Sequence, residues 1–528
     1  MELADIEASP QDAQDYIQSL EMKIESLTEE LRLAILRKFG RSSEKIDPSQ
    51  KELFEEMAPD EAEQEEQQIS IPSHTRKKSG RKPLDPNLPR EIIVHDIPEE
   101  EKICGCGHTL AKIDEVVSER LQVIPEQLYV EKHIRPKYAC RHCGWSQASL
   151  LLRPCIREGS GDEDKPVFRI APAPPSILPG SIVTSGLLAF ILVNKFCDHL
   201  PFYRQEKRFE RIGIRISRQD MSNWMNKVYL TLQFLEELFK KKIKEGPVIQ
   251  MDETTVQVLN EPERPDTCKS QMWLARGGPP DAPLVIYEYQ ETKSSQHAKA
   301  FLEGYSGYLQ SDGYAGYDAA LKDNDNIIHV GCLAHARRKF VEAARASKKA
   351  GSAQIAVKKI RNIYRVEKEL REKDLDEKEF LNRRKNQVEP LLKDLKEWLD
   401  DKALKVRPSC LTGEAISYTL GQWEKIVRYM ESPYLTPDNN AAERGIKPFV
   451  IGRKNWLFAG SPHGAKASSL FFSLIETAKE NNLNPYGYLK WIFDQVAVMD
   501  EQFNREKLLP WNCDRTEIQR MAFKGLGN

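Results

Sequence analysis

The sequence has no apolar run long enough to cross a membrane, because that needs about 18 to 20 consecutive apolar residues. The longest candidate, Leu187 to Val193, is short and has polar neighbours. The first residues, MELADIEASPQDAQ, are acidic and contain no apolar stretch typical of a secretory signal. Ten cysteines in 528 residues are too sparse for a disulfide scaffold. We therefore expect a cytoplasmic protein with reduced thiols and no membrane partner.

A net positive charge is also lacking, since 78 Lys and Arg face 80 Asp and Glu, giving a formal charge of −2. Bulk charge therefore does not indicate a nucleic-acid partner. Locally, an acidic stretch at 51–69 precedes a basic stretch at 74–82, HTRKKSGRK. This pattern is typical of a solvated linker, and equally of an arm that contacts DNA. The length predicts roughly three to four domains, and a hydrophobic content of 40% excludes global disorder.

Near the N-terminus, apolar residues recur with the alternating spacing of three and four that marks a coiled-coil seam. They are Ile17, Leu20, Ile24, Leu27, Leu31 and Ala34. We predict a leucine-zipper-like helix within 1–44 and, through it, a homodimer or higher oligomer. The alternative is one amphipathic helix packed on its own chain. The proline-rich residues 45–90 are predicted to be a charged linker.

The segment 91–157 combines short β-type runs with two cysteine pairs, Cys104-x-Cys106 and Cys140-x-x-Cys143. Glycines flank both pairs, as in the knuckles of a zinc ribbon, and four thiolates satisfy tetrahedral Zn²⁺. One residue between the first two cysteines is fewer than usual, so His108 or His142 is an alternative ligand. Unliganded thiols are the other reading. A Gly-, Asp- and Pro-rich linker is expected at 158–180.

Three helical patterns follow at about 182–196, 201–212 and 217–242, within a predicted helix-turn-helix-like segment 181–245. A break at Gly213 and the capping pattern Ser217-x-x-Asp220 precede the third helix. The basic residues of this segment are Arg204, Lys207, Arg208, Arg211, Arg215 and Arg218. Because phosphate neutralisation dominates DNA affinity, we predict DNA contacts for Arg204, Lys207, Arg208 and Arg218. Three packed helices without DNA contact are the alternative.

From residue 247 the pattern changes to three strands, then helix, strand, helix and strand, with a further helix from about Ala334. This order is that of an α/β RNase H-like domain, whose first part we place at 246–344. We expect Asp252 to end the first strand and Asp312 to follow the fourth. These positions face each other on adjacent strands in that fold, so their carboxylates are predicted to share Mg²⁺ or Mn²⁺.

Two carboxylates hold two such ions poorly, so a third acid is needed on a later helix. The segment PYLTPDNNAAERGIKP supplies Glu443, with a helix start at Pro437 and Asp438 and an end enforced by Pro448. We assign 431–495 to the second part of the catalytic domain and 496–528 to a C-terminal tail. The charged helical residues 345–430 are predicted to be an insertion.

Two further motifs carry chemistry. Cys332-x-x-His335 offers only two ligands, which alone make no zinc site, so we predict a structural role beside the catalytic acids. In GRKNWLFAG, Arg453 and Lys454 are predicted DNA contacts, and Trp456 is placed to stack on an unpaired base. Core packing of Trp456 is the alternative.

Several motifs in register resemble the transposases of bacterial insertion sequence 66 elements. They include FGRSSEK, GRKPLDPNLPRE, RPKYACRHC, DHLPFYRQEKRFERIGIRIS, MDETTVQVL, LQSDGYAGY, GCLAHARRKF, DNNAAERGIKP and the terminal LLPWN. The resemblance covers nearly the whole chain and implies a DDE-type transposase with Asp252, Asp312 and Glu443 as ligands of two metal ions. It also implies a zipper, a zinc-binding segment and a helix-turn-helix. Its partners would be terminal inverted repeats, target DNA and accessory proteins of the element. The short Cys104-x-Cys106 spacing departs from the pattern and leaves the first zinc knuckle open.

Two other functions fit parts of the sequence. A catalytically silent DNA-binding regulator would not need three acids in these places. An RNase H-like nuclease or resolvase would share the acids but would not need the zipper, zinc segment and helix-turn-helix.

Overall fold

The computed structural model describes residues 128–139, 168–346 and 351–523, together with isolated positions between 20 and 35. The described residues from Ser176 to Ala522 belong to one compact unit, and those from 128 to Pro175 belong to a second. Among the described helices, none has the length and apolar character to span a membrane.

The described positions near the N-terminus are helical. The apolar residues Leu20, Ile24, Leu27 and Leu31 of the predicted seam are exposed there, to between 42% and 64%. Ile35 is exposed as well. Nothing in the described part of the chain therefore covers this apolar seam.

The second unit contains a two-stranded antiparallel ribbon of β1 (Lys137–Ala139) and β2 (Phe168–Ile170). Arg135 extends the pairing, since its Nη1 donates to the carbonyl of Ala171 at 3.2 Å. β2 falls inside the predicted linker 158–180, so part of that segment is a strand because its backbone pairs with β1. The four predicted zinc ligands lie outside the described residues.

The predicted helix-turn-helix-like segment forms four helices rather than three. They are α3 (Ser185–Phe196), α4 (Phe202–Arg211), α5 (Arg218–Leu232) and α6 (Phe234–Ile243). The expected single helix over 217–242 is interrupted at Gln233, where α6 begins. Ser217 and Asp220 form the predicted capping box of α5, and Gly213 turns the chain after α4 with a φ of 82°. That positive φ favours glycine.

A mixed sheet follows, with the strand order β5-β4-β3-β6-β7. Its strands are β3 (Val248–Val258), β4 (Lys269–Gly277), β5 (Leu284–Gln290), β6 (Gly307–Gln310) and β7 (Ile327–Val330). The first three pair antiparallel, whereas β6 and β7 run parallel to β3. Helices α7 (Ser295–Leu302) and α8 (Ala315–Leu321) connect β5, β6 and β7 in the order predicted from the sequence.

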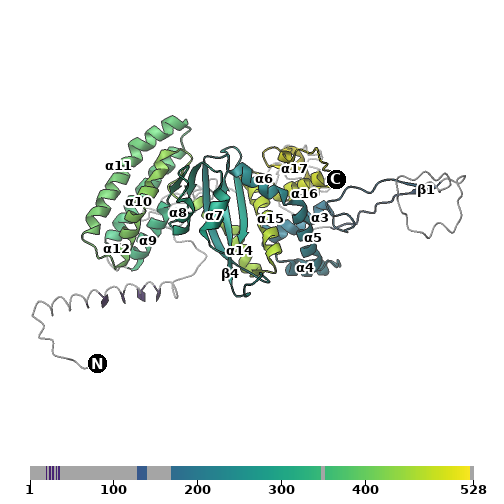
Figure 1. The fold of residues 1–528 in the computed structure, drawn as a ribbon, viewed down its shortest axis with the longest axis horizontal. Coiled ribbons are helices and arrows are strands. Elements are labelled where there is room, and N and C mark those ends of the chain that lie inside the picture. The colour runs from purple at the N-terminus through teal and green to yellow at the C-terminus, as the bar shows by residue number, and fades with distance from the viewer. Residues whose placement is uncertain are drawn as a thin grey trace, which may run out of the picture. The chain divides into compact units, whose positions relative to one another are not determined.

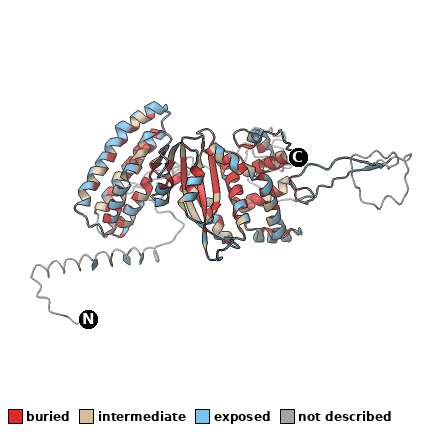
Figure 2. Ribbon diagram, viewed as in Figure 1, coloured by how far each residue is buried: buried red, intermediate tan, exposed pale blue. Residues whose placement is uncertain are grey.

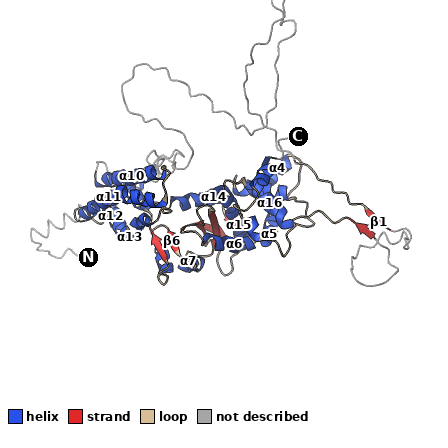
Figure 3. Ribbon diagram, turned by 90° about the horizontal axis from the view of Figure 1, so that it is seen from above, coloured by secondary structure: helices blue, strands red, loops and turns tan. Residues whose placement is uncertain are grey.

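Helices cover both faces of this sheet, which is why its strands are largely buried (Figure 2). On one face lies α14 (Asn440–Trp456), and on the other lie α6 and α7 (Figure 3). Helix α15 (Pro462–Glu480) runs along the free edge of β5, where the hydroxyls of Ser473 and Thr477 accept hydrogen bonds from the backbone N–H groups of Tyr287 and Val285. Leu274 and Tyr287 point to the α14 face, because Leu274 lies beneath Gly445 and the Tyr287 hydroxyl donates to the carbonyl of that glycine. The short strand β8 (Phe458–Ala459) links α14 and α15 and pairs with the end of β3.

Between β7 and α14 the chain builds a helical region with its own core (Figure 1). Its elements are α9 (Leu333–Ala346), α10 (Ser352–Arg371), α11 (Glu377–Ala403), α12 (Leu411–Gly421), α13 (Trp423–Val427) and η3 (Arg428–Glu431). Leu370, Leu395 and Ile416 are fully or almost fully buried in it. The C-terminal residues form α16 (Pro485–Ala497), η4 (Arg505–Leu508) and α17 (Arg515–Phe523).

Candidate active site

Strands β3 and β6 bring Asp252 and Asp312 to equivalent positions. Gln250 pairs with Gln310 in the parallel register, and each aspartate follows two residues later. Side chains alternate along a strand, so both aspartates return to the face of their glutamine. Asp252 lies in the middle of β3, opposite Leu274 of β4, and not at the strand end as the sequence indicated. The strand continues because β4 pairs with it as far as Gln257.

Glu443 lies in the first turn of α14, on the sheet face to which Leu274 points. A glycine allows this helix to lie close to the sheet, because a Cβ on Gly445 would come within 3.1 Å of Leu274 Cδ1. α14 also continues through Pro448 to Trp456, so the helix does not end where we predicted. Proline removes one backbone donor, but contacts of α14 with β3 and β4 along its length compensate for that loss.

The electrostatics of Asp252 reflect the proximity of the other acids. Burial is the main cause that raises the pKa of Asp252 to about 7, and the negative charges of Glu253, Glu443 and Asp312 raise it further. A hydrogen bond from the backbone N–H of Glu253 to Asp252 Oδ1, 2.9 Å long, acts in the opposite direction. The three predicted acids therefore interact, and among the described residues no cation forms an ion pair with Asp252.

Two cations do bind acids at this site. Arg338 of α9 contacts Glu443 at 3.0 Å, between Nη2 and Oε2. Lys293 forms an ion pair with Glu253, whose other oxygen accepts a 2.7 Å hydrogen bond from the hydroxyl of Tyr317. Lys293 was not predicted as a site residue from the sequence. It lies in a loop before α7, where no helix or strand periodicity singles out a residue.

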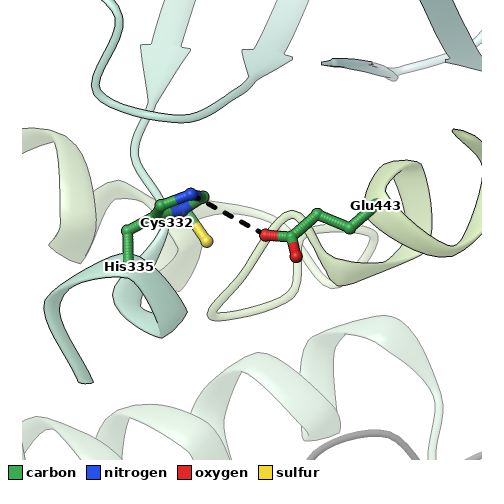
Figure 4. A group of neighbouring side chains, drawn as sticks. All are labelled: Cys332, His335 and Glu443. Carbon is green, nitrogen blue, oxygen red and sulfur yellow. Dashed lines mark ion pairs between the residues drawn. The ribbon is translucent and has the colours of Figure 1, made fainter. Parts of the chain in front are cut away.

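Cys332 and His335, at the start of α9, lie next to Glu443. Within the described part of the chain, these three form a group whose ligand atoms all lie within 4.8 Å of one another (Figure 4). His335 Nε2 is 3.9 Å from Glu443 Oε1, and burial lowers the pKa of His335. Asp252 and Asp312 do not join such a group with Glu443.

Asn439 connects β3, Cys332 and the start of α14 through hydrogen bonds. It was not identified from the sequence. Its Nδ2 donates to the carbonyl of Met251 at 2.8 Å, directly before Asp252. Its backbone N–H donates to Cys332 Sγ at 3.3 Å, and its carbonyl accepts from Glu443 N at 3.2 Å. The run Asp438-Asn439-Asn440 was visible in the sequence, but only the fold shows what it contacts.

The predicted DNA-contacting residues gather around α4 and the end of α14. Arg204, Lys207, Arg218 and Lys454 are exposed. Arg204 Nη1 donates to Asn455 Oδ1 at 3.1 Å, which joins α4 to α14. Arg208 donates to Asn194 Oδ1 at 3.2 Å, and Arg453 donates to the hydroxyls of Thr254 and Thr255 on β3.

Trp456 has the packing role of our alternative reading. Its ring lies 6.4 Å from that of Phe196 in an edge-on arrangement and 6.1 Å from that of Phe472. Lys195 Nζ lies 4.7 Å from the centre of the Trp456 ring. These contacts join α3, α14 and α15.

The acids fit hard divalent cations. Asp252, Asp312 and Glu443 offer only oxygen ligands, which Mg²⁺ and Mn²⁺ prefer. Burial and neighbouring negative charges raise the pKa of Asp252, so its ionised form gains from added positive charge. Arg338 must leave Glu443 before that carboxylate can bind an ion.

Comparison with known protein families assigns the chain to a class of enzymes. The model of the Transposase IS66 family matches residues 180–467, which include the whole sheet and all three acids. The zinc-finger binding domain of transposase IS66 matches 101–144, and the IS66 C-terminal element matches 473–511. A model described as Transposase C of IS166 homeodomain, a leucine-zipper model, matches 26–93. The chain belongs to the IS66 transposase family.

Related proteins of Sinorhizobium fredii (strain NBRC 101917 / NGR234) extend over most of the chain. The uncharacterized protein y4jD is 30% identical over 83% of this chain and 83% of its own length. The uncharacterized protein y4hP is 29% identical over 94% of this chain and 89% of its own. A solved structure, the Mos1 transposase paired-end complex with left transposon end, is 14% identical over 52% of this chain and 85% of that chain. The TM-score of this match is 0.13.

Proposed function

We propose that the protein is a DDE transposase with an RNase H-like catalytic core that cleaves DNA at the terminal inverted repeats of its element and joins the ends to target DNA. The observation that supports it best is that Asp252 on β3 and Asp312, just past the end of β6, each follow by two residues a glutamine of the pair Gln250–Gln310, with Glu443 close enough to raise the pKa of Asp252. The strand order and the helices on both faces support this core.

Asp252, Asp312 and Glu443 would hold two Mg²⁺ or Mn²⁺ ions. When bound, such ions activate a nucleophile and stabilise the departing oxygen during in-line displacement at phosphorus. In cleavage, water attacks the scissile phosphate, the P–O3′ bond breaks, and the 3′-oxygen leaves and takes up a proton. In strand transfer, that 3′-hydroxyl attacks a target phosphate and displaces its 3′-oxygen. The chain's own contribution is to fix three carboxylates on β3, after β6 and on α14.

Binding to DNA would use the basic residues of α4 and α5 and the end of α14. Arg204, Lys207, Arg208 and Arg218 supply positive charge near Arg453 and Lys454, since Arg204 contacts Asn455. Phosphate contacts of this kind position a duplex without reading its sequence. The exposed seam from Leu20 to Leu31 supports self-association through the N-terminal helix. The segment 101–144 would hold structural Zn²⁺ through Cys104, Cys106, Cys140 and Cys143.

The test is cleavage of DNA carrying the ends of the source element, with Mg²⁺ present or absent. Asp252→Asn, Asp312→Asn and Glu443→Gln are each expected to abolish nicking at the element ends and to leave DNA binding nearly intact. Asp281→Asn, an exposed loop substitution, is the matched control and should cleave normally. Binding by wild-type protein without any metal-dependent nicking would instead identify a regulator.

A further inference from the structure

Glu443 is shared by two possible sets of metal ligands. Its charge acts on Asp252, as does that of Asp312, and its carboxylate lies within 4.8 Å of the ligand atoms of Cys332 and His335. The sequence offered only two ligands in Cys332-x-x-His335, which was too few for a site. The fold adds Glu443 as a third.

The group has the composition of a site for a soft metal ion. Cys332 directly precedes α9 and His335 lies in its first turn, while Glu443 reaches toward both from α14 (Figure 4). Sulfur and imidazole ligands select Zn²⁺ and similar ions over Mg²⁺. Zn²⁺ bonds of about 2.0 to 2.3 Å place tetrahedral ligands roughly 3.3 to 3.8 Å apart, so shifts of about 1 Å close the observed spacing.

The imidazole is placed to present one nitrogen to an ion. Its Nε2 faces Glu443 Oε1 at 3.9 Å, while its buried Nδ1 has no hydrogen-bond partner among the described residues. The site is open enough for an ion to enter, since the side chains of His335 and Glu443 are 24% and 17% exposed. Arg338, which now neutralises Glu443, is 45% exposed and has room to move into solvent.

We propose that Cys332, His335 and Glu443 bind a thiophilic divalent ion such as Zn²⁺, and that this ion holds Glu443 away from Asp252 and Asp312. The ion would have three protein ligands and one open position, which water can fill. Because one carboxylate cannot serve both sites fully, zinc here would inhibit the reaction that Mg²⁺ supports. The inhibition rests on the proposed function, whereas the binding does not.

Binding is tested on the full-length protein by measuring zinc per chain after equilibration with Zn²⁺ and removal of the excess. Cys332→Ser is expected to lose about one zinc ion per chain relative to wild type. Cys268→Ser, which removes a thiol in a loop before β4, is the matched control and should keep the wild-type content. Cobalt substitution gives a second readout, because Cys332→Ser should weaken the thiolate-to-cobalt absorption.

His335→Ala provides an independent check if Cys332→Ser does not fold, because its partly exposed side chain is less needed for packing. Equal zinc content in wild type, Cys332→Ser and His335→Ala would overturn the proposal. Inhibition is tested by adding Zn²⁺ to Mg²⁺-dependent cleavage, where wild type should be inhibited and Cys332→Ser resistant. Equal inhibition of both would overturn the link to Glu443. Absence of cleavage with Mg²⁺ alone would count against the proposed function and leave the zinc measurement valid.

Discussion

Asp252 is the residue at which stability and chemistry oppose each other most clearly. It sits in the centre of a buried strand among other acids, and its pKa is raised to about 7. Ionising a carboxylate in such a place costs folding free energy, because the unfolded chain hydrates the same charge freely. Positive charge brought to Asp252, such as the metal ions of the proposed function, would offset that cost.

The first prediction follows from that pKa. An unfolded aspartate ionises near pH 4, whereas folded Asp252 keeps its proton until about pH 7, so wild-type stability falls as the pH rises between these values. Asp252→Asn removes this loss. In metal-free buffer we expect it to raise the free energy of unfolding by about 4 kcal/mol at pH 8 and by little at pH 4, because a shift from 3.8 to about 7 is worth roughly 1.4 kcal/mol per pH unit.

Urea unfolding at several pH values in the presence of a chelator measures this difference. Asp281→Asn, at an exposed loop position, serves as the control and should change stability equally little at each pH. A gain for Asp252→Asn that did not grow with pH would contradict the raised pKa.

The second prediction concerns Asn439, whose hydrogen bonds join β3, Cys332 and α14. Asn439→Ala leaves the carbonyl of Met251 buried without its donor. We expect a loss of about 1 to 3 kcal/mol in the free energy of unfolding. Asn386→Ala on the exposed face of α11 should cost less than about 0.5 kcal/mol. Thermal or urea unfolding compares the two, and equal losses would refute the anchoring role of Asn439.

At the scale of elements, the helical insertion supports the segment that leads into α14 through one buried cation. Arg384 of α11 is fully buried and donates to the carbonyls of Tyr429, Ser432 and Leu435. It also pairs with Glu367 of α10 at 2.9 Å. The bonded carbonyls lie in the segment that leads from η3 to α14, so this arginine fixes the start of that segment.

The third prediction tests this connection. Arg384→Met keeps much of the side-chain volume but leaves buried Glu367 with only a 4.0 Å contact to Arg371. It also removes the arginine donor from the carbonyls of Tyr429, Ser432 and Leu435, of which Leu435 still accepts from Arg371 and Ser432 from a backbone N–H. We expect a loss of about 3 to 5 kcal/mol in the free energy of unfolding. Arg383→Met, the neighbouring and partly exposed arginine paired with Glu379, should cost less than about 1 kcal/mol. Chemical denaturation distinguishes them, and similar costs would exclude the supporting role.

The elements also show how much of the fold could be predicted from the sequence. The strand and helix order from β3 to α9 was predictable, because each strand is a β-branched or aromatic run and each helix has an amphipathic period. Asp252 and Asp312 were chosen from that order and Glu443 from the need for a third carboxylate, and their role as metal ligands stays a prediction. The passage of α14 through Pro448 was not, since contacts with the sheet override the local preference of proline. Asn439 and Lys293 act through contacts distant in sequence, which local patterns do not encode.

For the whole molecule, a formal charge of −2 means that DNA affinity must come from local basic surfaces. The fourth prediction is that converting Arg204, Lys207, Arg208 and Arg218 together to Gln weakens binding to element ends. Each phosphate contact contributes roughly 0.9 to the log–log salt slope. Arg208 is also engaged with Asn194, so we expect the slope to fall by about two to three rather than by the full amount.

Fluorescence anisotropy over a series of salt concentrations measures the slope. The charge-matched control converts four lysines of the helical insertion, Lys385, Lys393, Lys396 and Lys405, to Gln and should leave the slope unchanged. If both variants behaved like wild type, another part of the chain would hold the DNA.

Helix α14 carries Glu443 near its start and Arg453 near its end, and Arg453 is bonded to β3. Ten residues of helix span about 15 Å, which is the rise of roughly four base pairs of duplex DNA. A single rigid helix therefore fixes the spacing between the phosphate that is cut and the phosphates that the basic end contacts. Under the proposed function, the protein and not the DNA sequence sets the distance from the cleaved bond to the nearest duplex phosphates that the basic residues contact. Element ends with one base pair inserted in that interval would then be cut at a shifted bond rather than at the original one.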